Sequence, residues 1–179
     1  MSKTKSFQIR PIELTDNSSV AHIIRTVMTE FECVGEGYSI NDPEVDAMFE
    51  AYDKENEMFY VIENESTKKL LGCGGIAHLK DAEPNVCELQ KMYFLNELRG
   101  YGMGSRLLEI CLSMAKELGY SKCYLETTKR MTSANKLYQK NGFKPLNASE
   151  GNTGHCACDS FYMLELKTEM PFSMLLNEK

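Results

Sequence analysis

The sequence predicts an α/β (α+β) domain in which helices cover both faces of a mixed sheet. Two observations predict it. Short apolar strands and amphipathic helices follow one another in the order β-α-α-β-β-β-α-β-α-β-β, and that order requires a mixed sheet between helical layers. The chain has 179 residues, of which 42% are hydrophobic and 26% charged, as in one globular domain. We therefore expect a single domain over 1–179, with a core at about 6–167 and a C-terminal tail at 168–179.

The first 94 residues are expected to hold four strands and two helices. Residues 7–12 alternate between apolar and polar side chains, as a half-buried strand does. The capping residues 16–18 precede an apolar helical stripe at 20–31, and Pro43 opens a second, shorter helix. Three further strands are expected at 58–62, 70–79 and 86–94. The middle one of these contains glycines that allow a bulge, namely Gly72, Gly74 and Gly75.

The second half is expected to hold two helices and three strands. A glycine-rich turn at 99–104 leads into an amphipathic helix, which Gly119 ends as a C-terminal cap. Cys123 to Leu125 forms a short buried strand. Thr132 or Ser133 caps the next helix, which ends at Gly142. The last two strands begin at Phe143 and span 161–166.

Composition excludes several classes of protein. Lys and Arg number 20 and Asp and Glu number 26, so the net charge is −6, which argues against a nucleic-acid binder. No apolar run approaches the roughly 20 residues of a membrane span, and no apolar stretch follows the N-terminal lysines as in a signal peptide. The seven scattered cysteines are typical of reduced thiols. We therefore predict a cytoplasmic protein without a membrane or nucleic-acid partner.

The turn at 99–104 is a candidate phosphate site. A helix N-terminus presents unpaired N–H groups and a positive dipole end, and glycines let the backbone approach a ligand. Two familiar phosphate loops do not fit. A Walker loop needs Lys and Ser/Thr after its last glycine, whereas Ser105 and Arg106 follow Gly104. A dinucleotide-binding turn needs a G-x-x-G step and follows a first strand.

The pattern Arg99-x-x-Gly102-x-Gly104 instead resembles the acyl-CoA pyrophosphate loop of the GCN5-related N-acetyltransferase (GNAT) superfamily. Three other segments resemble that superfamily in the proper order, namely Ile9-Arg10-Pro11 with Asp16, Glu88 to Phe94, and Leu137 to Phe143. The resemblance spans most of the chain. It implies the GNAT fold, a twisted and mostly antiparallel sheet of about seven strands, and an acyltransferase that uses acetyl-CoA as cosubstrate.

The resemblance also implies the residues that bind the cofactor. The loop backbone with Ser105 is expected to hold the pyrophosphate, and the Arg99 side chain either helps or lies on the surface. Met92 and Phe94 are expected to pair with the pantetheine arm through their backbones, as an added strand does. Tyr93 lies between them and lines the site. The cofactor-binding residues are therefore Met92, Tyr93, Phe94, Arg99, Gly100, Tyr101, Gly102, Met103, Gly104 and Ser105.

Acetyl transfer to an amine needs a base for the amine proton and benefits from an acid for the CoA thiolate. Tyr138 matches the superfamily's general-acid tyrosine, and its alternative is a core tyrosine. Glu88 is the best candidate for the base, directly or through water, and its alternative is a solvated carboxylate. Glu126 is a weaker candidate. One departure from the superfamily is Met131, which stands where a cofactor-contacting Asn is frequent.

The small-residue segment 151–159 corresponds to a loop that borders the acceptor pocket in this superfamily. His155 is therefore a weak candidate for substrate contact, and a surface histidine is the alternative we favour. Cys156 and Cys158 lie beside it, but a structural zinc site needs four ligands, so we expect no metal. We expect residues 31–46 to form the acceptor wall, and their acidic side chains either attract a cationic amine or face solvent.

The sequence therefore predicts an acetyl-CoA-dependent N-acetyltransferase that moves an acetyl group directly to a primary amine of a small molecule or peptide. Two alternatives stay open: a catalytically silent acyl-CoA-binding regulatory module, and an acetyltransferase of protein N-termini or lysines. A closed acceptor pocket formed by residues 31–46 favours a small molecule, and an open groove favours a protein. A homodimer is an additional expectation from the resemblance.

Overall fold

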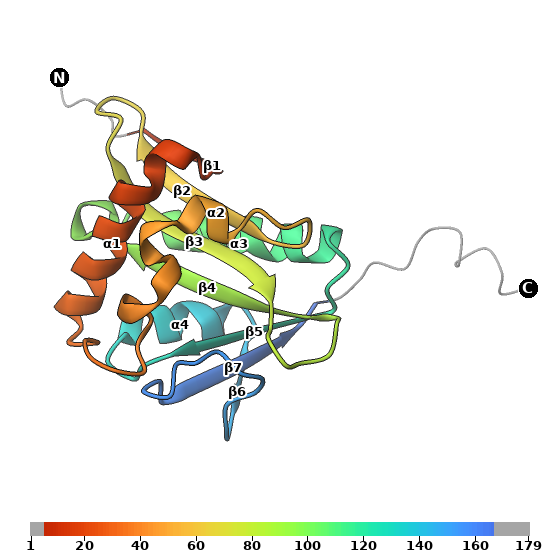
Figure 1. Cartoon of the computed structure of the whole chain (residues 1–179). Coiled ribbons are helices and arrows are strands. Elements are labelled where there is room, and N and C mark those ends of the chain that lie inside the picture. The colour runs from red at the N-terminus through yellow and green to blue at the C-terminus, as the bar shows by residue number, and fades with distance from the viewer. Residues whose placement is uncertain (1–5, 167–179) are drawn as a thin grey trace, which may run out of the picture.

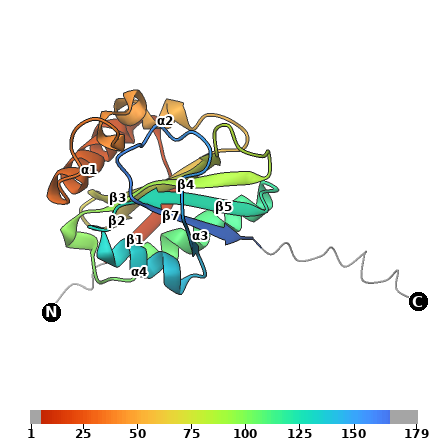
Figure 2. The same ribbon diagram turned by 90° about the horizontal axis from the view of Figure 1, so that it is seen from below.

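The computed structural model describes residues 6–166 as one seven-stranded sheet with helices on both faces (Figures 1 and 2). The predicted tail at 168–179 lies outside the described residues. The strands are β1 (Phe7–Pro11), β2 (Met58–Asn64), β3 (Leu70–His78), β4 (Val86–Phe94), β5 (Lys122–Thr127), β6 (Lys144–Leu146) and β7 (Ser160–Glu165). The helices are α1 (Asn17–Glu30), α2 (Met48–Ala51), α3 (Met103–Glu117) and α4 (Thr132–Lys140). Short 3₁₀ turns occupy Leu14–Asp16, Ser39–Asn41, Pro43–Asp46 and Asn96–Leu98.

The sheet has the order β1-β2-β3-β4-β5-β7-β6. Every neighbouring pair is antiparallel except β4 and β5, which are parallel. The prediction of a mixed and mostly antiparallel sheet is confirmed. The element order is also confirmed, although the helix expected from Pro43 is broken into a 3₁₀ turn and the four-residue α2.

The helices form two layers (Figure 2). Helices α1 and α2 cover one face of the sheet, and α3 and α4 cover the other. The apolar stripe of α1 is buried, as are Leu107, Leu108 and Cys111 of α3. Burial of such stripes removes apolar surface from water and supplies most of the stability of amphipathic helices. Five of the seven cysteines are buried thiols in this core, namely Cys33, Cys73, Cys87, Cys111 and Cys123.

A β-bulge interrupts the pairing of β3 and β4. Between the pairs Cys73–Tyr93 and Gly75–Gln90, β4 advances three residues while β3 advances two. The extra residue is accommodated at Lys91, whose φ is +51°, a conformation that is rare outside glycine. Gly74 faces the bulge, and a Cβ there would lie 3.2 Å from the Met92 Cα. The glycines of β3 therefore permit the bulge, as predicted, but the extra residue lies in β4.

Strands β4 and β5 pair only at their first residues. Their ladder runs from Val86–Lys122 to Glu88–Tyr124 and then stops. Beyond Glu88, the β4 edge that faces β5 has no strand partner, so its backbone groups are open to a ligand. This gap between two parallel strands positions the candidate site.

Candidate active site

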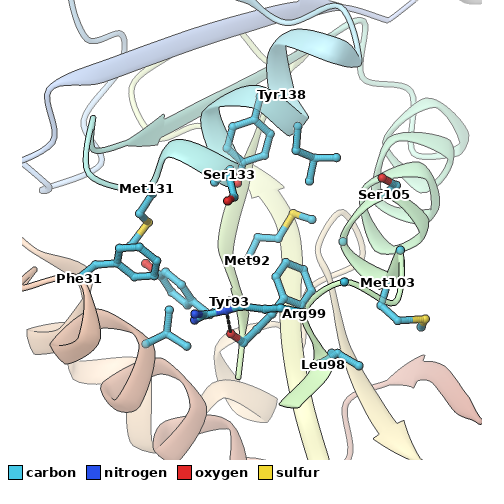
Figure 3. Close-up of a pocket in the computed structure, with 17 residues that line it drawn as sticks. Phe31, Met92, Tyr93, Leu98, Arg99, Met103, Ser105, Met131, Ser133 and Tyr138 are labelled. Atoms are coloured by element: carbon cyan, nitrogen blue, oxygen red, sulfur yellow. Dashed lines mark hydrogen bonds between the residues drawn. The ribbon is translucent and has the colours of Figure 1, made fainter. Parts of the chain in front are cut away.

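A cavity of about 380 Å³ lies at the gap, between the end of β4 and the N-termini of α3 and α4 (Figure 3). In Figure 3, Tyr138 of α4 lies across this cavity from Arg99, and Met92 lies between them. Apolar side chains and glycine backbone make up most of the wall. Nine of the ten predicted cofactor-binding residues line it, namely Met92, Tyr93, Phe94, Arg99, Gly100, Gly102, Met103, Gly104 and Ser105.

Tyr101 is the predicted residue that does not line the cavity. Its side chain is half exposed and its ring packs against Phe7, with the ring centroids 5.2 Å apart. The sequence could not separate Tyr101 from its neighbours, because the direction of each side chain depends on the turn conformation.

The glycine loop leaves the N-terminus of α3 open. Gly100 and Gly102 have φ values of +84° and +74°, and Gly102 is the N-cap of the helix. No side chain caps this helix end, so its first N–H groups and its dipole are available to an anion. A Cβ at Gly102 would meet no atom within 4 Å. Gly102 is therefore required for its backbone conformation and not by crowding.

Arg99 is already engaged on the opposite wall. Its guanidinium forms a bidentate ion pair with Glu30 at the end of α1, in which Nη2 lies 2.7 Å from Oε2. Its Nε donates to the Phe94 carbonyl at 3.1 Å, and its side chain lies over the Phe31 ring. The side chain thus ties the loop to α1 and β4, and it also lines the larger cavity.

The Asn that is frequent at position 131 in the superfamily has no counterpart in the described cavity wall. Met131 is the N-cap of α4 and lines the cavity with its thioether side chain. Asn135 donates to the carbonyls of Thr128 and Met131 at 2.8 and 2.9 Å and accepts from the Tyr162 hydroxyl at 2.8 Å. Asn135 therefore holds the β5–α4 connection, and no side-chain amide replaces the missing Asn in the cavity wall.

A second, smaller cavity of about 50 Å³ lies on the other side of the gap, under α1 and the loops at 31–46 and 151–159. Met92, Tyr93, Met131 and Tyr138 line both cavities. The polar residues of the second cavity include Glu88, Lys91, Glu126 and His155. The two cavities therefore meet where β4 and β5 separate, one of them narrow and charged and the other wide and apolar.

Glu88 is buried in the smaller cavity and not solvated. The residue is 4% exposed. Burial raises the pKa of its carboxyl to about 7, against the opposing effect of a 2.5 Å hydrogen bond from Gln90 Nε2. Such a carboxyl can bind and release a proton near neutral pH, as a general base must.

Tyr138 lies between the two cavities. It is 6% exposed and its ring packs edge-on against Phe143. Among the described residues its hydroxyl has no hydrogen-bond partner, and yet no fully enclosed side-chain oxygen there lacks one, so the hydroxyl faces the cavity space. Burial raises the pKa of Tyr138 well above its usual value, which keeps the hydroxyl protonated and able to donate.

His155 lies inside the site and not on the surface, so the alternative that we favoured from sequence is wrong. Its Nε2 donates to Asp42 Oδ2 at 2.9 Å. Lys91 Nζ donates to the same carboxylate oxygen at 2.5 Å and lies 3.2 Å from Glu44 Oε1. Because of the bulge, Lys91 can turn toward the 31–46 loop, where Asp42 joins it to His155. The acidic wall is therefore partly neutralised from within the site.

Of the two cysteines beside His155, Cys158 is not activated. Cys156 is exposed, and burial raises the pKa of the Cys158 thiol to about 12, so Cys158 stays protonated at neutral pH. Within residues 6–166, no three His, Cys, Asp or Glu side chains lie together as metal ligands would. In the same part of the chain no helix has the length and apolar character of a membrane span.

Two polar residues of the site were missed by sequence reasoning, namely Gln90 and Lys91, whereas Asp42 belongs to the acidic wall expected at 31–46. Gln90 could have been found, because it lies two residues from Glu88 and thus on the same strand face. Lys91 gave no local signal, because its position depends on the bulge, and the pairing of Asp42 with His155 depends on two distant loops that meet.

A split between parallel strands, an open helix N-terminus beside it and a buried carboxyl across it together define an acyltransferase. The chain belongs to the Acetyltransferase (GNAT) family, which it matches over residues 22–143. It is 37% identical over 159 residues to the uncharacterized N-acetyltransferase YjgM of Escherichia coli K12, which covers 88% of this chain and 94% of that protein. Human N-acetyltransferase 8B is 34% identical over 93 residues, or 51% of this chain and 40% of the human protein.

Solved structures share the fold. A GNAT-family acetyltransferase from Staphylococcus aureus Mu50 superposes with a TM-score of 0.78 at 21% identity, covering 90% of this chain and all of that one. The putative acetyltransferase yncA from Salmonella typhimurium, solved with its cofactor acetyl-CoA, superposes with a TM-score of 0.72 at 16% identity and covers 92% and 96% of the two chains. The predictions of the GNAT superfamily, its fold and an acyltransferase activity are confirmed.

Proposed function

We propose that this chain transfers an acetyl group from acetyl-CoA directly to the primary amine of a small molecule. One observation carries the proposal. The buried Glu88 carboxyl on the acceptor side and the unpartnered Tyr138 hydroxyl line the same small cavity, which meets the larger one at the gap between β4 and β5. A base and an acid are thus available on the two sides of one reaction centre.

The larger cavity suits acetyl-CoA. The open N-terminus of α3 and the loop Gly100–Ser105 would hold the pyrophosphate through backbone N–H groups, which needs no excess of lysine. The unpaired edge of β4 would hold the pantetheine arm. Of the two residues expected to bind this arm, Phe94 already accepts a hydrogen bond from Arg99 at its carbonyl oxygen. Met92 is therefore the better partner. The acetyl-CoA found in yncA, which shares this fold, supports the assignment.

The chemistry follows from the positions of the two groups. Glu88 takes a proton from the acceptor ammonium, directly or through water, and the free amine attacks the thioester carbon. The C–N bond forms first, and a backbone N–H of the open β4 edge stabilises the oxyanion of the tetrahedral intermediate. The nitrogen then loses its second proton to solvent, and the C–S bond breaks. Tyr138 gives its proton to the leaving thiolate. Solvent then restores that proton, and Glu88 releases its own.

The acceptor side favours a small molecule over a protein. The loops at 31–46 and 151–159 are joined over the cavity by the Asp42–His155 hydrogen bond and by Ala157 N, which donates to the Gly37 carbonyl at 3.2 Å. Packing there is tight, since a Cβ at Gly37 would lie 2.6 Å from the Cys156 Sγ. A peptide laid across an open groove would find no room between these loops.

The test is acetyl-CoA turnover, followed by release of free thiol, across a panel of small primary amines, N-terminal peptides and lysine peptides. Thiol release with at least one small amine and with no peptide is expected. Turnover with peptides alone would overturn the small-molecule proposal. Tight CoA binding without thiol release on any acceptor would instead identify a silent binding module.

A further inference from the structure

A chain of hydrogen bonds reaches Glu88 from behind the site. The Tyr52 hydroxyl, at the end of α2, donates to Gln90 Oε1, and Gln90 Nε2 donates to Glu88 Oε2 at 2.5 Å. Glu88 and Gln90 lie two residues apart on β4 and so share one face of the strand. Tyr52 lines neither of the two cavities, and no part of the proposed chemistry uses it.

In this chain the hydrogen bonds are donated from the Tyr52 hydroxyl to Gln90 and from Gln90 to Glu88. A side-chain amide has an acceptor end and a donor end, and either can face a neighbour. Burial raises the pKa of Tyr52 well above its usual value. Its hydroxyl therefore keeps its proton and donates a hydrogen bond to Gln90 Oε1. The NH₂ end of Gln90 then faces Glu88 and donates to its carboxylate. The reverse orientation would present a carbonyl oxygen to the carboxylate, which only a protonated Glu88 could accommodate.

The position of Tyr52 is fixed by its packing on strand β2. Its ring packs against Phe59, with the centroids 4.8 Å apart. Phe59, Gly75 and Gln90 are direct neighbours across β2, β3 and β4. A Cβ at Gly75 would lie 2.6 Å from Phe59 Cδ2, so only glycine lets that ring lie over the strand and support Tyr52 against Gln90.

We propose that Tyr52 and Gln90 are a positioning pair, which presents an amide donor to Glu88 and thereby keeps this carboxyl ionised and aimed at the acceptor. A carboxylate that accepts a hydrogen bond is favoured over the acid. The pair therefore allows a deeply buried carboxyl to work as a base near neutral pH. The proposal rests on the role of Glu88 given under Proposed function.

Other charged and titratable groups also face Glu88 and act on the same equilibrium. The groups on β4 and on the 151–159 loop include cations, and the groups on β5 are acidic or neutral. They are Lys91 of β4, Tyr124, Glu126 and the Cys123 thiol of β5, and His155 and the Cys158 thiol of the 151–159 loop. None of them contacts Gln90 or Tyr52 by a hydrogen bond in the described part of the chain, so the two substitutions below leave these groups in place.

The test is the titration of Glu88 in protein labelled with carbon-13 at the Glu side-chain carboxyl, with the signal assigned by its absence in Glu88→Gln. In Tyr52→Phe the ring stays on Phe59 but the amide can turn over, and in Gln90→Leu the donor is lost. Both variants should raise the Glu88 midpoint by about one pH unit. Turnover should then fall roughly tenfold at pH 6.5 and little at pH 8.5.

Tyr120→Phe is the matched control. Tyr120 is also buried, and its hydroxyl donates to the Asn56 carbonyl at 3.0 Å, away from both cavities. It should leave the Glu88 midpoint unchanged. An unchanged midpoint in both Tyr52→Phe and Gln90→Leu would overturn the proposal, as would an equal loss of turnover at every pH. If Glu88→Gln keeps the wild-type pH profile, the base role fails separately, while the titration still decides the role of the pair.

Discussion

His155 Nε2 lies 2.9 Å from Asp42 Oδ2, although 113 residues separate them in the chain. This contact joins the two loops that close the acceptor cavity. Because Lys91 donates to the same oxygen, the carboxylate also fixes both loops to the bulge of β4. One aspartate thus determines the shape of the acceptor side without facing the cofactor.

Asp42→Asn should therefore weaken acceptor binding more than acetyl-CoA binding. Asn keeps the shape of the side chain but loses the charge that holds Lys91 and His155, so the loops should separate more easily. We expect KM for the amine to rise about tenfold while KM for acetyl-CoA stays within twofold. Steady-state kinetics with each substrate varied in turn would show this. An equal rise in both KM values would contradict the assignment of these loops to the acceptor.

The same pair should make stability depend on pH. Burial lowers the pKa of His155, but the hydrogen bond and charge of Asp42 raise it more, so its folded pKa lies above the ordinary value. The stabilisation is then complete below the unfolded pKa of about 6.5 and is lost as pH rises through the folded pKa. His155→Gln should be less stable than wild type by roughly 1–2 kcal/mol at pH 5.5, and the difference should shrink by pH 8.5 in urea denaturation. A difference that grows with pH would contradict this sign.

Gly102→Glu should abolish acetyl-CoA binding. The substitution forces a residue with a side chain into φ +74° and places a carboxylate at the open end of α3. The matched control is Gly119→Glu at the other end of the same helix, where φ is +87° and the space is equally open. Both variants carry the backbone strain, about 1–2 kcal/mol. Calorimetric titration should show at least a 100-fold loss of affinity for Gly102→Glu and none for Gly119→Glu.

The sequence was sufficient for features that depend on neighbouring residues. The glycine loop, the helix that it opens and the glycine at 119 are local patterns, and the structure has each of them where it was expected. Order along the chain then predicted the sheet, because few topologies connect those elements.

The contacts on the acceptor side could not be predicted from the sequence in the same way. Asp42 meets His155 only because two loops fold onto one bulge, and Gln90 is oriented by Tyr52 from a four-residue helix. Polar contacts between distant segments leave no periodic trace in the sequence. The sequence could not decide whether Glu88 is buried or solvated for a related reason. The exposure of a carboxylate near a strand end depends on the loops that cover it.

Tyr138→Phe should lower turnover and leave acetyl-CoA affinity unchanged. Only the hydroxyl is removed, and it has no hydrogen bond within the described residues, so the fold loses nothing. Tyr162→Phe is the control, since its hydroxyl donates to Asn135 in the same layer but lies outside both cavities. We expect kcat to fall by about 10²-fold or more for Tyr138→Phe and by less than twofold for Tyr162→Phe. Wild-type kcat in Tyr138→Phe would remove this residue from the mechanism.

Glu88→Gln should lose turnover and gain stability at alkaline pH. The folded pKa of about 7 lies above the ordinary 4.5, so between these values the native state binds more protons than the unfolded state and stability falls as pH rises. Removing the carboxyl relieves a cost of up to about 3 kcal/mol and also removes the base. At pH 8 we expect kcat/KM to fall at least 10²-fold and the urea midpoint to rise, with the gain absent at pH 4. A variant that is slow and also less stable at pH 8 would show that Glu88 serves the fold and not the reaction.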